Sequence, residues 1–236
     1  MVFLGEYMKS YLATSLLIGA LSVSLSAGAE HHEEKPAALP YALWSTYEIA
    51  PGQTPAEVQA SLETYLKAEE TRGFDNCVMY RHEIGSERSF YTACTFKDMH
   101  HFAKINDSAP PAASSERQLF AAHMDHVVMM TKLGMKTLPN YLMFATTTFS
   151  SDLSVAEQQA NAEDFYSIYD DAFGGCNQYQ HLWGPELAYY AICGFDNYKA
   201  LANATDVILG EKAKKIMTTH FHITTHRDDI LVKVMD

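Results

Sequence analysis

The chain contains two copies of one segment. Residues 77–96 align with residues 176–195 without a gap, at a constant offset of 99, and eight of the twenty positions are identical. Unrelated segments of this length would share about one residue. The identical pairs are Cys77/Cys176, Tyr80/Tyr179, His82/His181, Gly85/Gly184, Glu87/Glu186, Tyr91/Tyr190, Cys94/Cys193 and Phe96/Phe195. The chain is therefore an internal duplication, and its fold must accommodate the same unit twice.

Each copy of the segment has the pattern of a β-hairpin. The turn signals are Gly85-Ser86 in the first copy and Gly184-Pro185 in the second. A two-residue turn at these positions sets the two cysteines of each copy directly opposite each other, with Cβ atoms about 4.5 to 5.5 Å apart. Four cysteines permit three pairings, and this geometry selects Cys77–Cys94 and Cys176–Cys193. Reactive or metal-binding thiolates are the alternative, and they need a reducing compartment.

An export signal precedes the first copy. Within residues 1–29, Lys9 is followed by an uncharged stretch, residues 12–27, that ends in small residues. This pattern predicts a secretory signal peptide, with Met8 as an alternative start, and a periplasmic or extracellular protein. The apolar stretch is too short and too rich in small residues for a membrane span. Residues 30–40 are polar and predict a disordered lead-in.

The predicted elements follow the same order in both copies. In the first repeat, residues 41–135, we expect strands at 41–49 and 125–132, the hairpin, and helices at 54–72, 97–105 and 114–122. In the second, residues 141–236, we expect strands at 141–149 and 219–226, the hairpin, and helices at 154–173, 196–204 and 210–217. Each repeat thus gives the order βαββαβ, the ferredoxin-like split unit, and residues 136–140 join the two.

Two such units in one chain resemble the dimeric α+β barrel superfamily. The fold class is then α+β, with two tandem ferredoxin-like βαββαβ repeats packed as an intrachain α+β barrel. The resemblance covers Tyr41 to about Val234 and rests on element order and duplication. It implies two sheets face to face, a small-molecule ligand between sheet and helices, and a monomer with an intrachain pseudo-dimer or a homo-oligomer. Members include cofactor-independent monooxygenases, haem-handling enzymes, lyases, cyclases and stress proteins, so the fold does not select an activity.

A tyrosine and histidine face is shared by the two hairpins. Side-chain alternation sends the cysteines to one face and a repeated set of rings to the other. These candidate catalytic residues are Tyr80, His82 and Tyr91 in the first copy and Tyr179, His181 and Tyr190 in the second. A histidine can act as a general base near neutral pH, and a tyrosine hydroxyl can orient or protonate an oxygen. The alternative is structural, a cross-strand aromatic pair that stabilises each hairpin.

A second group of histidines suggests a metal site. His220, His222 and His226 would share one face of the expected closing strand, and His126 occupies a roughly matching place in the first repeat. Two such histidines can bind zinc, copper or iron. If the leader is cleaved after Ala29, His32 becomes the third residue and resembles an amino-terminal Cu(II) motif. Strand histidines without a metal are the alternative.

Other function classes are disfavoured by composition and by missing motifs. The net charge of -12 disfavours nucleic acid as a partner. The sequence has no GxGxxG, P-loop, HExxH, CxxCH or GxSxG motif. The cofactor stays open: none, a transition metal, or noncovalent haem. Two hypotheses follow: an exported small-molecule binder or cofactor-independent enzyme of monooxygenase or lyase type, or a non-enzymatic metal-binding, haem-binding or interaction module.

Overall fold

The computed structural model describes residues 40–85, 88–108, 119–211, 214 and 221–235. The first half consists of β1 (Tyr41–Ile49), α1 (Pro55–Arg72), β2 (Asp75–Ile84), β3 (Ser89–Phe96), α2 (Met99–Asp107) and β4 (Phe120–Lys132). The second half consists of β5 (Tyr141–Phe149), α3 (Val155–Phe173), β6 (Cys176–Trp183), β7 (Tyr189–Phe195), α4 (Tyr198–Ile208) and β8 (Ile223–Met235). The described elements of both halves follow the order βαββαβ.

The two long helices begin and end as their sequences predict. Thr54 caps α1 and Ser154 caps α3, and each forms a capping box with the glutamate three residues later. Gly73 and Gly174 end the helices in the left-handed conformation, with φ of 119° and 76°.

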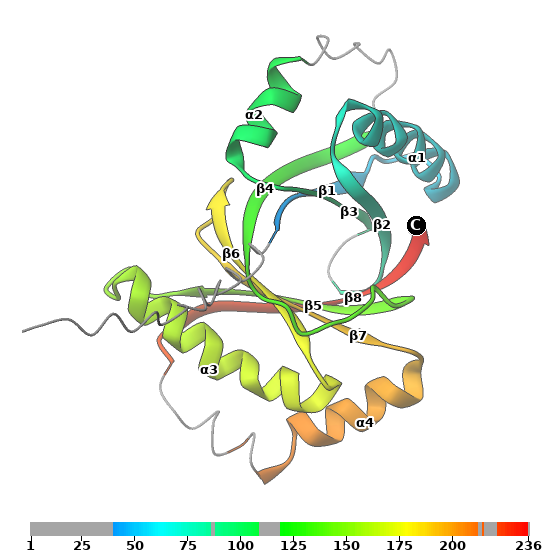
Figure 1. The fold of residues 1–236 in the computed structure, drawn as a ribbon. Helices are drawn as coiled ribbons and strands as arrows, with labels where there is room; N and C mark the ends of the chain where they lie inside the picture. Colours follow the sequence, from blue (N-terminus) through cyan, green and yellow to red (C-terminus); the bar gives the residue numbers. More distant parts are fainter. Residues whose placement is uncertain (1–39, 86–87, 109–118, 212–213, 215–220, 236) are drawn as a thin grey trace, which may run out of the picture. The chain divides into compact units, whose positions relative to one another are not determined.

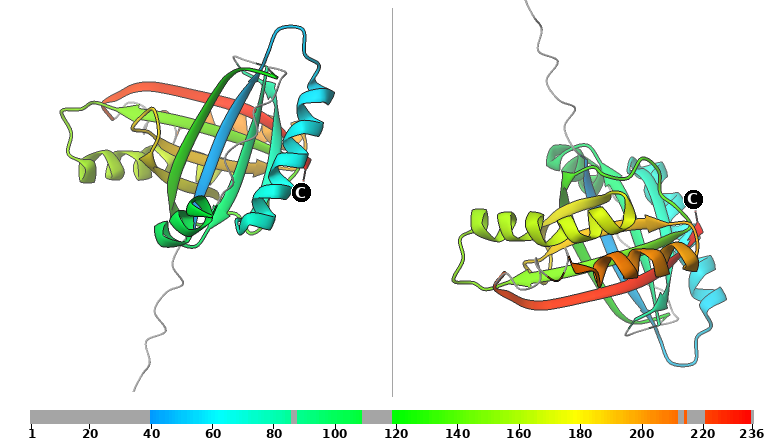
Figure 2. Two further views of the ribbon diagram at one scale, coloured as in Figure 1. Left: turned by 90° about the horizontal axis from the view of Figure 1, so that it is seen from above. Right: turned by 90° about the horizontal axis from the view of Figure 1, so that it is seen from below.

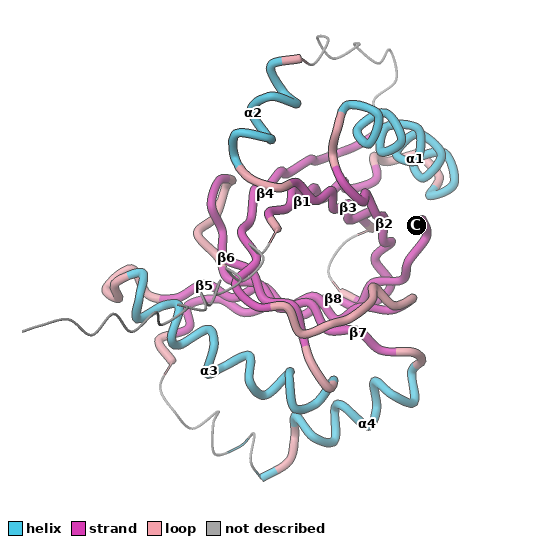
Figure 3. Tube along the Cα trace, in the orientation of Figure 1, coloured by secondary structure: helices cyan, strands magenta, loops and turns pink. Residues whose placement is uncertain are grey.

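The strands form one closed antiparallel barrel in the order β1-β3-β2-β8-β5-β7-β6-β4. Each half contributes four neighbouring strands, and the halves are joined by hydrogen-bonded ladders between β2 and β8 and between β4 and β6. Figure 3 shows the strands as a ring, and the two views in Figure 2 show them crossing the barrel obliquely. The resemblance led us to expect two sheets face to face. Here they are also fused edge to edge into a continuous barrel.

The helices lie outside the barrel, α1 and α2 on one side and α3 and α4 on the other (Figure 1). Alternation along the strands divides the core accordingly. One cluster packs Val58, Leu62 and Leu66 of α1 on the outer face of the first half, and another packs α3 and α4 on the second. A third cluster, which includes Trp44 and Phe144, lies inside the barrel.

Both expected disulfides are present on the outer faces of the hairpins. Cys77 faces Cys94 and Cys176 faces Cys193 in the strand registers, with Cα–Cα distances of 4.1 and 4.4 Å. These are distances of the non-hydrogen-bonded position in an antiparallel ladder, where side chains approach most closely. All four cysteines are buried in the clusters beneath the helices.

Some element boundaries differ from the sequence-based expectation. The closing strand β8 begins at Ile223 and continues to Met235, later than the expected 219–226. Within the expected helix at 114–122, residues 120–122 belong to strand β4, and residues 114–118 lie outside the described residues. Most of the expected helix at 210–217 and all of residues 1–39 also lie outside them. Among the helices that the structure describes, none has the length and apolar character needed to cross a membrane.

Candidate functional site in the barrel lumen

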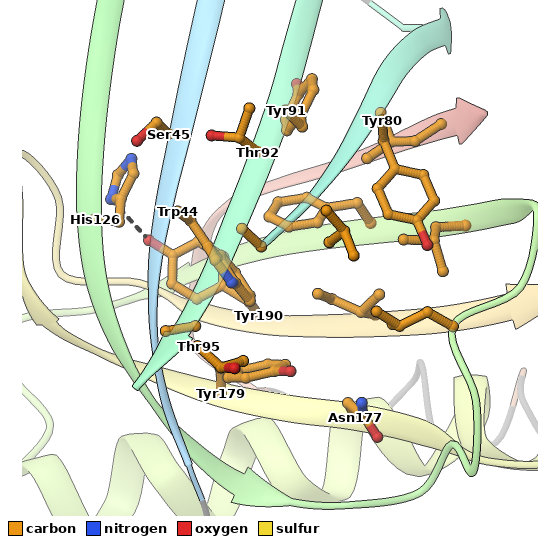
Figure 4. A pocket seen from close by; sticks show the side chains of 18 of the residues that line it. Trp44, Ser45, Tyr80, Tyr91, Thr92, Thr95, His126, Asn177, Tyr179 and Tyr190 are labelled. Carbon is orange, nitrogen blue, oxygen red and sulfur yellow. Dashed lines mark hydrogen bonds between the residues drawn. The ribbon is translucent and has the colours of Figure 1, made fainter. Parts of the chain in front are cut away.

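The barrel encloses a cavity of about 1190 Å³. Its wall is formed by inward-facing side chains from all eight strands, because alternate residues of each strand point into the barrel. The aromatic lining residues are Trp44, Tyr80, Tyr91, Phe144, Tyr179 and Tyr190. Figure 4 shows most of these rings surrounding the cavity. An aromatic cavity with a few polar groups is the usual form of a small-molecule site.

Trp44 is the centre of the aromatic wall. It is 6% exposed, and its ring centroid lies 5.1 Å from that of Phe144, 4.6 Å from that of Tyr179 and 5.0 Å from that of Tyr190. Trp44 belongs to the first half and its three partners to the second, so the contact holds the halves together. The tilted and edge-to-face geometries are those that aromatic rings prefer. Burial raises the pKa of Tyr179 to about 12, which keeps its hydroxyl protonated at neutral pH.

One polar pair faces the cavity from the wall beside Trp44. The Tyr190 hydroxyl lies 3.2 Å from Nδ1 of His126, and the dashed line in Figure 4 marks this contact. Both residues line the cavity. Burial lowers the pKa of His126, so its imidazole is neutral at neutral pH, and burial raises the pKa of Tyr190. A neutral imidazole hydrogen-bonded to a protonated phenol can accept and return a proton.

The pseudo-equivalent place in the other half holds a carboxylate. His126 faces Trp44 in the register of β1 and β4, and Asp229 faces Phe144 in the register of β5 and β8. The Tyr91 hydroxyl donates to Oδ2 of Asp229 at 3.2 Å, as Tyr190 contacts His126. In both cases the tyrosine comes from the hairpin of one half and its partner from the closing strand of the other. The two halves thus make the same kind of contact, each with the last strand of the other.

Asp229 is completely buried and carries two further polar contacts. Its Oδ2 lies 3.0 Å from Nε of Arg227, and its Oδ1 lies 3.4 Å from Nε2 of His82. Arg227 balances the negative charge that burial would otherwise penalise.

The side chains at positions 229 and 126 help to explain why each hairpin turn begins with a glycine. Gly85 has φ of 152°, and a Cβ there would lie 2.1 Å from Nε2 of His82 and 2.3 Å from Oδ1 of Asp229. Gly184 has φ of 144°, and its Cβ would lie 2.8 Å from the backbone oxygen of Asp125 and 3.1 Å from Nδ1 of His126. Both the backbone conformation and the close approach require glycine.

The structure separates the six predicted catalytic residues into two groups. The tyrosines at 80, 91, 179 and 190 line the lumen cavity. His82 and His181 are on the same strand face but do not line it: His82 contacts Asp229, and the His181 ring lies 6.4 Å from that of His126. Both histidines therefore lie behind the residues that reach the cavity.

Sequence reasoning did not identify Trp44 and Asp229 as site residues. A signal for Asp229 exists in the closing strands, because residues 123–128 read HMDHVV and residues 226–231 read HRDDIL. This match has an offset of 103, unlike the offset of 99 in the hairpins. It aligns His126 with Asp229 and His123 with His226.

The structure does not bring the predicted metal ligands together. His222 precedes β8 and has φ of 55°, so it does not share the strand face of His226, and His220 lies outside the described residues, as does His32. His226 is offset by an odd number of residues from Asp229, the counterpart of His126, and therefore points out of the barrel. Across the described ranges, no cluster of three histidine, cysteine or acidic side chains could hold a metal ion.

Both ring nitrogens of His226 are occupied by protein groups under α3. Its Nδ1 lies 2.9 Å from Oγ1 of Thr147, and its Nε2 lies 2.9 Å from the Tyr169 hydroxyl and 3.2 Å from Oδ2 of Asp228. This histidine therefore has a structural role between sheet and helix.

A smaller cavity of about 310 Å³ lies between the first-half sheet and its helices. Its lining includes Tyr65, Glu69 and Arg72 of α1 and Asp125 of β4. The resemblance implies a ligand between sheet and helices, but the larger cavity is the barrel lumen.

Comparison with known proteins gives similarity of structure alone. No protein-family model matches this chain, and no curated protein sequence matches it. Among solved structures, an anthrone oxidase-like protein is 8% identical with a TM-score of 0.58, covering 83% of this chain and 91% of that one. A putative monooxygenase from Fusobacterium nucleatum is 12% identical with a TM-score of 0.52, covering 83% and 93%. A chlorite dismutase mutant from Candidatus Nitrospira defluvii is 7% identical with a TM-score of 0.50, covering 82% and 91%.

At these identities the likeness concerns the fold. The similar structures and the closed eight-stranded barrel with outer helices agree on one architecture. The chain has the fold of the dimeric α+β barrel proteins.

Proposed function

We propose that this chain binds a small aromatic molecule in the lumen of its barrel. The observation that carries the proposal is the cavity of about 1190 Å³ with its aromatic wall. Its volume lies slightly above the range of roughly 300 to 1,000 Å³ that is usual for sites of drug-sized molecules. Rings stack well on such a wall because offset and edge-to-face contacts add to the burial of apolar area.

The ligand lies against the first-half wall in this proposal. Trp44 faces Ala93 across β1 and β3, whereas Phe144 faces Ile192 across β5 and β7. All four residues line the cavity. The small side chain of Ala93 leaves room beside Trp44 that Ile192 fills in the other half. An aromatic ring seated there would contact Trp44.

The His126–Tyr190 pair supplies an acid–base step of the kind used by a cofactor-independent enzyme. A ligand O–H or acidic C–H gives its proton to the Tyr190 oxygen while the Tyr190 proton moves to Nδ1 of His126, and the anion forms on the ligand. The 3.2 Å contact supports this path of transfer, and the lowered pKa of His126 keeps its imidazole neutral and able to accept the proton. The fold shared with an anthrone oxidase-like protein and a putative monooxygenase is compatible with such chemistry.

The binding proposal is tested by the fluorescence of Trp44. The chain has two tryptophans, and Trp183 is 64% exposed, so Trp183→Phe leaves Trp44 as a reporter inside the lumen. Titration with 2-naphthol should change its emission in a saturable manner. Ala93→Ile, which introduces the residue found at the matching position 192, should weaken binding at least tenfold. As a control, Ala202→Ile changes an exposed alanine of α4 and should leave binding unchanged. No saturable response, or equal affinity in both variants, would contradict the proposal.

The acid–base step has its own test. Tyr190→Phe and His126→Gln should leave 2-naphthol binding within a few-fold but abolish exchange of an acidic ligand proton, followed by NMR with anthrone in deuterated water. Retention of the protein-catalysed exchange rate in both variants would contradict the assigned roles.

We further propose that residues 41–135 and 141–236 are duplicated ferredoxin-like units and that one chain supplies both halves of the barrel. The repeated element order and the two disulfides support this account. Disulfides persist in oxidising compartments, which supports export to the periplasm or the extracellular space with residues 1–29 as the leader. Intact mass spectrometry of the exported protein tests this: a mature chain starting near Glu30 with no free thiol is expected.

A further inference from the structure

A polar row crosses the second-half wall of the lumen. Tyr190, Thr146 and Arg227 are direct cross-strand neighbours on β7, β5 and β8, and all three line the cavity. Cross-strand partners on one face have Cβ atoms about 4.5 to 5.5 Å apart, so the three side chains form one continuous strip.

The matching row of the first half lacks a charge. Its members are Tyr91, Thr46 and Met124, related by the same registers on β3, β1 and β4. The cavity is therefore lined by a methionine on one side and by Arg227 at the equivalent place on the other. Because the two rows occupy equivalent places in the strand registers of the two halves, the arginine is a difference specific to the second half.

The buried hydroxyl of Thr146 indicates that a ligand atom binds at this row. Thr146 is 6% exposed, and its Oγ1 has no hydrogen-bond partner among the described residues. A buried hydroxyl without a partner is costly, because it has lost its contacts with water. An acceptor in the cavity would satisfy it.

Arg227 is positioned at the row by the buried carboxylate of Asp229. The contact is made through Nε, at 3.0 Å from Oδ2. A guanidinium carries five N–H donors, so Arg227 can add a ligand carboxylate to the partners it already has. Glu186 also lines this part of the cavity. Its side chain and that of Arg227, which is 41% exposed, both meet solvent, and solvent screens the attraction between them.

We propose that Thr146 and Arg227 of this row bind the carboxylate of an aromatic acid whose ring occupies the lumen. The proposal rests on the lumen function above and adds the class of ligand. Arg227 supplies the cation and Thr146 a hydroxyl donor, which together match a carboxylate. A positive group at this wall is also needed to draw an anion into a chain with a net charge of -12.

The test compares 2-naphthoate with 2-naphthamide, which has the same rings and no charge. Calorimetric titration of the Trp183→Phe protein should give binding of naphthoate at least tenfold tighter than that of the amide. Arg227→Met, which introduces the residue of the first-half row, should weaken naphthoate binding by roughly 10- to 100-fold, the range for loss of a charge-assisted hydrogen bond, and leave amide binding within about threefold. Lys199→Met removes an exposed charge of α4, away from the cavity lining, and should change neither by more than about threefold.

Thr146→Val tests the same row without removing a charge. It therefore remains informative if Arg227→Met unfolds the protein by leaving Asp229 without its cation. This near-isosteric variant keeps every charge and should weaken naphthoate binding about tenfold while folding normally. Equal affinity of naphthoate and naphthamide, with no loss in Thr146→Val, would overturn the carboxylate proposal and leave lumen binding intact. Failure of both probes to bind would overturn the lumen function as well.

Discussion

Removal of either disulfide should destabilise the protein by about the same amount. We consider the paired substitutions Cys77→Ala with Cys94→Ala, and Cys176→Ala with Cys193→Ala. Both bonds close a loop of 17 positions. The chain-entropy model assigns a loop of this length about 3 kcal/mol of stabilisation, because the crosslink restricts the unfolded chain. Alanine is chosen because all four sites are buried and a serine hydroxyl would be left without a partner.

The measurement is urea unfolding at pH 7 under oxidising conditions, supported by thermal melts. For a protein of this size, 1 kcal/mol corresponds to roughly 2 to 4 °C, so each pair should lower the Tm by roughly 6 to 12 °C. The two bonds lie in different halves, so loss of both should be near-additive, at about 6 kcal/mol. A loss below about 1 kcal/mol for each pair would refute the reasoning. A large difference between them would mean that packing beneath α1 or α3, and not chain entropy, sets their contribution.

Three further predictions follow from local features of the fold. Gly85→Ala should lower the free energy of unfolding by roughly 1 to 3 kcal/mol, because its Cβ would meet His82 and Asp229. Gly52→Ala should lower it less, because a Cβ there has nothing within 4 Å. Equal losses in chemical unfolding would contradict the packing argument. Thr54→Ala and Ser154→Ala should each lower the free energy of unfolding by about 1 kcal/mol through loss of a helix cap. A loss of only a few tenths of a kcal/mol would argue against the capping boxes. Because the pKa of His126 is lowered in the folded protein, this imidazole binds a proton more readily in the unfolded chain. The free energy of unfolding should therefore fall as the pH drops below about 6.5, and His126→Gln should reduce this loss. The same pH profile in His126→Gln and the parent protein would count against a buried neutral imidazole.

The hairpins could be predicted from the sequence because their contacts are local. The turn glycines fix the register, and the register then fixes both the disulfides and the tyrosine pairs, Tyr80 with Tyr91 and Tyr179 with Tyr190. The helix ends could be predicted for the same reason, since the capping box of α1 joins residues within four positions of the chain.

The lumen site could not be predicted because it is assembled across the two halves. Tyr91 and Asp229 are separated by 138 positions, and no local pattern joins them. The boundary of β8 was missed for a related reason. Residues 224–228 are exposed, so the strand begins without the apolar alternation that marks a half-buried strand, and its buried residues come only at Asp229, Ile230 and Leu231.

The most direct test of the account is a crystal structure of the protein soaked with 2-naphthoate. The account predicts density for the ring system inside the barrel beside Trp44, with the carboxylate at Thr146 and Arg227. Density instead in the smaller cavity between α1 and the sheet, or an empty lumen at saturating probe, would contradict it.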